Sequence, residues 1–235
     1  MMTLPRDIVN NDWILGVLLL LLLLLAVLVS AYRTLIYKIL MASVSKQHYI
    51  GLQREENEIY RKVSMFLNFI SFLSIALFFY FILTRTVIDN TTLRNMGISG
   101  LVFYLLVLLG TICAIGLQFG VVYLTGWIFK SQANSQEYQF NIFLTYKLLG
   151  VFLVPVLFFL AYAPSSSGVL FMNIGLLLLL FVSIKRYVVG FQIGLSISAF
   201  PKLYSILYIC TLEFLPIAIL LKWQGLEFSQ KILGI

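Results

Sequence analysis

The chain has 235 residues, of which 61% are hydrophobic and 11% charged, with a mean hydropathy of +1.02 and a net charge of +7. A soluble domain carries about a quarter charged residues, so this composition excludes a soluble globular protein and predicts an all-α, polytopic transmembrane helical bundle. The length allows about six spans of roughly 20 residues with short loops, so we expect a single membrane domain over residues 1–235.

The basic excess is explained more simply by membrane topology and contact with anionic lipid headgroups than by nucleic acid, which we do not expect as a partner. The two cysteines, Cys113 and Cys210, both fall within apolar segments, where free cysteine packs as a small apolar residue. We therefore expect no disulfide, no metal site and no cofactor.

The first predicted span covers residues 13–32, a leucine-rich run. It is longer than a typical signal-peptide core and no A-x-A cleavage site follows, which favours an uncleaved helix. Beyond it, apolar residues recur at helical spacing over residues 35–44, with Lys38 and Lys46 interleaved. This pattern predicts an amphipathic helix over about residues 34–48 that lies in the headgroup region, where both lysines would contact anionic lipid.

The second predicted span, residues 63–84, carries Asn68, Ser71 and Ser74 at intervals of three. Such spacing places the three side chains on one face of a helix. Small and polar residues on one face of a membrane helix indicate packing against another helix.

The third apolar region, residues 99–129, is too long for one untilted span. A long tilted helix is favoured over a re-entrant loop, because aromatic and basic residues at its end are typical of the interface. Gly116 and Gly120 form a GxxxG pair that allows another helix to approach closely, and Gln118 lies between them as a candidate polar contact.

The fourth predicted span, residues 141–163, contains Lys147 and Pro155. Lys147 lies about 9 Å along the helix from the start of the span, so its ammonium can snorkel to the near interface, which is the simpler interpretation. Pro155 should bend the helix, and the backbone groups that it frees need a partner inside the bundle.

The fifth predicted span, residues 169–184, ends at Lys185 and Arg186, which we expect to contact anionic headgroups. The next segment, residues 187–201, includes Gly190 and Gly194 as candidate helix-packing positions. It fits either an extension of the fifth helix or a helix along the interface, and the sequence does not separate the two.

The sixth predicted span, residues 203–221, carries Glu213 near its middle and Pro216 three residues later, where a second bend is expected. A central carboxylate costs roughly 2.5–3.5 kcal/mol on insertion, so it needs a partner or a proton. Two alternatives stay open. Glu213 pairs with Lys147, or a protonated Glu213 donates a hydrogen bond to a carbonyl, such as one exposed near Pro155.

The distribution of basic residues predicts the orientation of the chain in the membrane. With six spans, one side holds ten of the Lys and Arg residues outside the spans and the other side holds five. By the positive-inside rule the side with ten is cytoplasmic, which places both termini in the periplasm.

The closing pattern from Tyr204 to Pro216, YSILYICTLEFLP, resembles the C-terminal signature of an uncharacterised integral-membrane family of Bacteroidota, domain-of-unknown-function family 4271. The organisation before it, with a basic first loop and a proline-containing span, is compatible with that family. The resemblance implies a bacterial inner-membrane location and supplies no activity.

The residues point to no catalytic constellation: the sequence has neither a His-rich metal set nor a glycine-rich phosphate loop before a helix. We expect a non-enzymatic inner-membrane subunit that packs with other membrane proteins, with an accessory role in envelope protein export or assembly as its context. The alternative is a small transporter or ion-coupled carrier that uses Glu213 and Lys147. A lipid-modifying enzyme would require a polar cavity open to the headgroup region.

Overall fold

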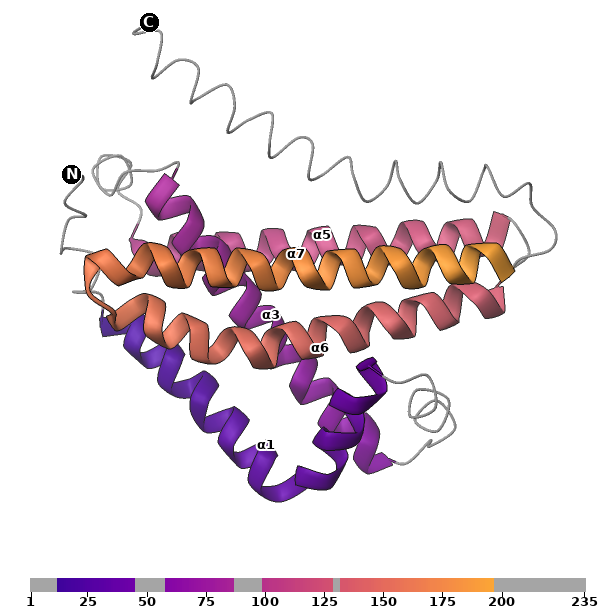
Figure 1. Cartoon of the computed structure of the whole chain (residues 1–235), viewed down its shortest axis with the longest axis horizontal. Coiled ribbons are helices and arrows are strands. Elements are labelled where there is room, and N and C mark those ends of the chain that lie inside the picture. Colours follow the sequence, from indigo (N-terminus) through magenta and orange to yellow (C-terminus); the bar gives the residue numbers. More distant parts are fainter. Residues whose placement is uncertain (1–11, 45–57, 87–98, 129–131, 197–235) are drawn as a thin grey trace, which may run out of the picture. The chain divides into compact units, whose positions relative to one another are not determined.

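The computed structural model describes residues 12–44, 58–86, 99–128 and 132–196. These residues form five long helices and, within the same ranges, no strands (Figure 1): α1 (Asp12–Val44), α3 (Glu58–Thr86), α5 (Gly100–Ile128), α6 (Gln132–Tyr162) and α7 (Ser165–Ser196). Each contains a stretch long and apolar enough to cross a membrane. The predicted all-α, multi-span architecture is therefore confirmed, while the sixth predicted span, residues 203–221, lies outside the described residues.

The helices extend beyond the predicted spans. α3 begins at Glu58 rather than at residue 63, and α6 begins at Gln132 rather than at residue 141. Residues 187–196 continue α7 without a break. Hydropathy marks the part of a helix that crosses lipid, whereas the backbone hydrogen bonds of a helix continue through polar residues into the headgroup region.

α1 consists of two segments that meet at Tyr32, whose backbone angles (φ −133°, ψ 38°) are not helical. Figure 1 shows α1 changing direction in its second half. We call the second segment, residues 33–44, the basic arm. The amphipathic helix predicted over residues 34–48 thus continues α1 as far as Val44, and its remaining residues are not described.

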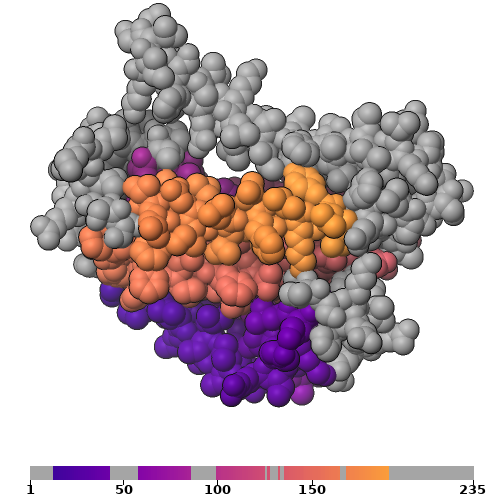
Figure 2. All heavy atoms as spheres, in the orientation of Figure 1, coloured from indigo at the N-terminus to yellow at the C-terminus, as the bar shows by residue number. Residues whose placement is uncertain are grey.

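α3 and α6 form the centre of the bundle. α3 contacts α1, α5 and α6, and α6 also contacts α1 and α5. The largest fully buried side chains come mainly from these two helices, among them Phe78 and Phe81 of α3 and Leu153 of α6. In contrast, large apolar side chains cover the outer sides of α1 and α7, coloured indigo and orange in Figure 2, including Leu19, Leu23 and Leu177.

Contacts between distant residues show the relative directions of α1, α3, α5 and α6. The ring of Trp13 lies 5.2 Å from that of Tyr80 and 5.5 Å from that of Tyr104, so α1 and α5 begin where α3 ends. At the same end, Arg85 Nη2 donates to the carbonyl oxygen of Leu160 (3.2 Å). α3 and α6 therefore end at the same side of the bundle and run in the same direction, and they cross (Figure 1) where Ser71 meets Gly150.

Three glycines permit close helix approaches. A Cβ at Gly150 of α6 would collide with both the backbone and the side chain of Ser71 in α3. Likewise, a Cβ at Gly175 of α7 would collide with the ring of Phe78. The third is Gly126 near the end of α5, where the same substitution would meet a serine side chain of α6. Because lipid is as apolar as the helices, such close packing is what favours their association.

Three buried hydroxyl groups of α3 donate hydrogen bonds to carbonyl oxygens of the same helix. Ser71 donates to the carbonyl oxygen of Leu67 and Ser74 to that of Ile70, both at 2.8 Å, and Thr84 makes the same kind of bond to Tyr80. These hydroxyls are buried without needing a partner on another helix.

The described residues up to Ser183 belong to one compact unit, and a second unit begins at Ile184. The helix–helix contacts described here lie within the first unit.

Candidate functional site

The most deeply buried charge among the described residues is Lys147, in the middle of α6, whose side chain is 3% exposed. Its ammonium nitrogen donates to Ser64 Oγ at 2.5 Å and lies 5.9 Å from the centroid of the Tyr60 ring. Both partners belong to α3. The ammonium is therefore held by one hydroxyl and one aromatic face, neither of which carries a charge.

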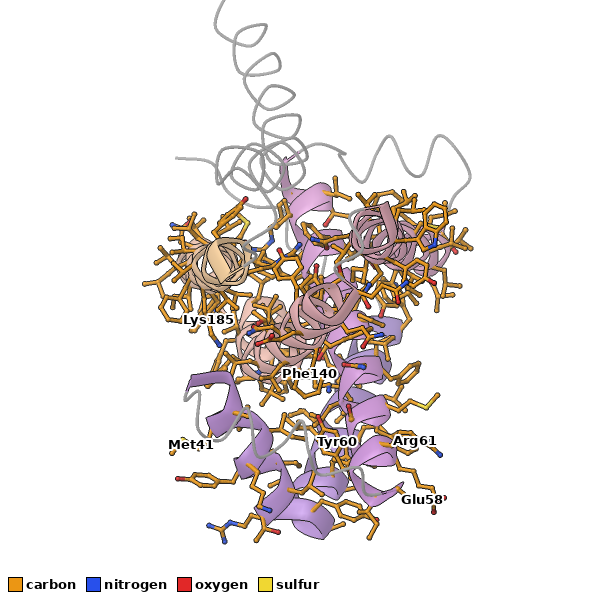
Figure 3. The ribbon with its side chains drawn as sticks, turned by 90° about the vertical axis from the view of Figure 1, so that its right-hand side faces the viewer. Met41, Glu58, Tyr60, Arg61, Phe140 and Lys185 are labelled. Carbon is orange, nitrogen blue, oxygen red and sulfur yellow. The ribbon has the colours of Figure 1, made fainter. Side chains whose placement is uncertain are left out.

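Tyr60 and Ser64 lie in the first two turns of α3, next to its polar start. In Figure 3, Tyr60 is directed towards the inside of the bundle, whereas Glu58 and Arg61 point outward. Lys147 thus extends from the middle of α6 towards the polar end of α3, through protein rather than along a lipid-facing surface. A long flexible stem with a charged tip suits this position.

The predicted partner of Lys147, Glu213, lies outside the described residues, as does Pro216. Their roles in pairing and bending stay predictions. Asn68, one turn after Ser64, is partly buried, and its Oδ1 atom has no hydrogen-bond partner in the described part of the chain. In a bilayer an unpaired carbonyl group of this kind is costly.

Gln118 connects α5 to α6. Its Oε1 accepts a hydrogen bond from the hydroxyl of Tyr146 (2.9 Å). One residue further along α5, Phe119 stacks on Phe143, with ring centroids 4.2 Å apart, and its carbonyl oxygen accepts a bond from Gln139 (3.4 Å). The structure therefore gives Gln118 a specific partner and a role in holding the two helices together.

Gly116 and Gly120 lie on the side of α5 that no other described helix covers. A Cβ added at either position would meet no described atom within 4 Å. Around them α5 exposes large apolar side chains together with a cysteine: Leu109, Ile112, Cys113, Tyr123 and Trp127. We call these seven residues the α5 outer face. The predicted GxxxG packing thus has no counterpart among the described helices.

The glycines that do pack closely, Gly150 and Gly175, were not singled out from the sequence. A signal for each was present. Gly150 lies one turn after Lys147, and a polar residue in a membrane helix usually faces protein. Gly175 follows Gly168 by seven residues, which puts both on one face of α7.

The remaining residues singled out from the sequence differ in how far they are buried. Pro155 is exposed, and α6 continues through it. Lys185 and Arg186 are partly buried on α7, and Lys38 is exposed on the basic arm. Gly190 is buried, whereas only the helical backbone of α7 is described at Gly194. Lys46 lies outside the described residues.

Within the described ranges, no three His, Cys, Asp or Glu side chains lie close enough together to hold a metal ion.

The chain matches a model of a protein family. The family model described as Domain of unknown function (DUF4271) matches residues 14–224, which is most of the chain. This confirms the resemblance suggested by the pattern from Tyr204 to Pro216. No curated protein and no solved structure matches the chain.

Proposed function

Since the chain belongs to the family Domain of unknown function (DUF4271), whose description carries no activity, we propose a function from its surface: it is a non-enzymatic membrane subunit that packs against another membrane protein through the α5 outer face. The proposal builds on the membrane-spanning helices described above. It further assigns the protein to the bacterial inner membrane, as an accessory component of an envelope protein export or assembly complex.

The uncovered glycine pair carries this proposal. Only 6% of the spanning segment of α5 is buried, against 61% of that of α3. Glycine costs a helix about 1 kcal/mol relative to alanine. Gly116 and Gly120 bring no close contact within the described bundle that would offset this cost.

The shape of the α5 outer face supports a helix as the partner. The two glycines form a low centre between larger side chains, Ile112 before them and Tyr123 and Trp127 after them. A helix of another protein that crosses at the glycines can come close to the α5 backbone, while its flanking residues pack against the larger side chains. This arrangement favours one crossing point over a sliding contact.

The charges of the described residues support the proposed orientation. Arg33, Lys38, Arg61 and Lys62 lie where α1 ends and α3 begins, whereas Arg85 lies at the other end of the bundle. The end with four basic residues is the cytoplasmic one under the positive-inside rule. The N-terminus then lies in the periplasm.

Cys113 offers a direct test, because it is exposed on the same face as the glycines. With Cys210→Ser, it becomes the only thiol of the chain. Thiol crosslinking in native membranes, followed by purification and mass spectrometry, should then capture a reproducible partner through Cys113. The double variant Gly116→Leu/Gly120→Leu should abolish that crosslink at an unchanged protein level.

Gly16→Leu is the matched control. Gly16 also has no described atom within 4 Å of an added Cβ, but it lies on α1 and not on the α5 outer face. It should leave the crosslink intact. A monomer without any reproducible crosslinked partner would refute the proposal, and so would equal loss in the control and the double variant.

An ion-coupled carrier is the second candidate, favoured by the burial of Lys147 against uncharged partners. Its test is Glu213→Gln. A phenotype indistinguishable from wild type at equal protein level would remove the coupling group on which this function depends.

A further inference from the structure

The basic arm is held in place by the protein itself. Its inner side consists of Ile36, Ile39 and Ala42, which are 5%, 1% and 4% exposed and belong to the main hydrophobic core. An amphipathic helix that binds a membrane by insertion needs its apolar side for lipid. Here that side is already buried, so the arm presents its other side to its surroundings.

The outer side of the arm carries Arg33, Thr34, Tyr37 and Lys38, all of which are exposed. Residues four apart in a helix are neighbours, with Cβ atoms about 5–6 Å apart. Arg33 therefore neighbours Tyr37, and Thr34 neighbours Lys38. Each pair combines a cation with a hydroxyl, so four N–H or O–H donor groups share one surface.

These donors suit a phosphate group. Arginine binds phosphate oxygens through two parallel N–H bonds, lysine adds a compact positive charge, and hydroxyls complete the set. The arm begins directly after the leucine-rich part of α1, which exposes Leu19, Leu23 and Val27. Aromatic and basic residues that follow an apolar span are typical of the headgroup level. An acyl chain can thus lie along α1 with its headgroup at the arm.

We propose that the outer side of the basic arm binds the headgroup of an anionic phospholipid, with its phosphate held between Arg33 and Lys38 and accepting hydrogen bonds from Thr34 and Tyr37. The role of the arm is then to fix the end of the first span at the membrane surface through a lipid contact. This inference is independent of the α5 outer face.

Lipid binding to the purified full-length protein in detergent tests the proposal, with native mass spectrometry as the readout. Phosphatidylglycerol is the anionic probe and phosphatidylcholine the zwitterionic one. Because each basic residue near an anionic surface contributes about 1 kcal/mol, Arg33→Gln/Lys38→Gln should weaken phosphatidylglycerol binding about 30-fold. Phosphatidylcholine binding should change by less than about threefold, since its headgroup has no net charge.

Arg61→Gln/Lys62→Gln is the charge-matched control, because both residues are exposed at the same end of the bundle but lie on α3. It should leave phosphatidylglycerol binding within about threefold of wild type, as expected for charges outside the contact. Thr34→Val/Tyr37→Phe keeps the charge and removes the two hydroxyls. This variant should weaken binding by about three- to tenfold, and it provides a test if the charge variant does not fold.

Several results would overturn the proposal: equal loss in the arm variant and the α3 control, equal binding of the two lipids by the wild type, or displacement of the lipid by inorganic phosphate at the same concentration. An arm variant that keeps phosphatidylglycerol but loses a crosslinked acidic protein in native membranes would assign the surface to a protein instead.

Discussion

Gly150→Ala places a single methyl group at the closest approach of the two central helices. The new Cβ would collide with the Cα, Cβ and Oγ atoms of Ser71. A side chain can rotate away, but the Cα atom of a neighbouring helix cannot. The variant therefore has to separate α3 from α6 at the point where they cross, about one turn of α6 after Lys147, whose ammonium donates to Ser64.

The expected cost follows from this geometry. Extra methyl groups in a well-packed core typically cost about 1–3 kcal/mol. At an exposed helix position the same change is favourable by about 0.5–1 kcal/mol, because alanine is the better helix former. Gly16 is such a position, because no described atom lies within 4 Å of a Cβ added there. Gly16→Ala is therefore the comparison variant. Both variants share this gain in helix propensity, so they should differ by the overpacking cost alone, about 1–3 kcal/mol in the free energy of unfolding.

The assay is denaturant unfolding of the purified protein in micelles, followed by circular dichroism. Ser71→Gly in the Gly150→Ala background should restore part of the loss, because it removes two of the three colliding atoms. Equal stability of Gly150→Ala and Gly16→Ala would refute the described crossing of α3 and α6.

Five further variants, in three groups, test other contacts by their free energies of unfolding. Lys147→Met should leave it unchanged or raise it by about 1–4 kcal/mol, because an apolar side chain of similar length avoids burying a charge; a clear loss would contradict the described burial. Gln118→Leu should cost about 0.6 kcal/mol, and adding Tyr146→Phe should cost nothing more, since the first change already breaks their bond; additive losses would argue against that bond. Ile39→Ala should cost about 2–5 kcal/mol and Tyr37→Ala less than about 0.5 kcal/mol; equal effects would mean that the apolar side of the arm does not face protein.

Hydropathy located the spans better than it located the ends of the helices. The run of leucines in α1 and the apolar stretch of α6 stand out from the sequence, because the bilayer requires them. The polar start of α6 does not stand out, although Gln139 within it contacts α5. A helix that extends beyond the bilayer keeps its backbone hydrogen bonds, and hydropathy does not measure backbone hydrogen bonding.

Glycine spacing did not predict where the described helices approach one another most closely. Gly116 and Gly120 fit the GxxxG pattern, yet they lie on an uncovered face, whereas Gly150 lies at the α3–α6 crossing. Similarly, the sequence marks Lys147 as unusual, but its partner Ser64 is 83 residues away. Which helices contact one another depends on their arrangement in space. The sequence of one helix alone does not identify its partner.

Because α3 and α6 cross the membrane in the same direction, the order in which the helices are inserted matters. α3 is synthesised well before α6, and α5 has to cross the membrane in the opposite direction between them. During that interval α3 must reside in lipid without its main partner. Three hydroxyl groups of α3 already donate hydrogen bonds to carbonyl oxygens of the same helix, namely those of Ser71, Ser74 and Thr84. They therefore need no partner on α6 while α3 is in lipid. These internal hydrogen bonds lower the cost of leaving α3 in lipid before α6 is present.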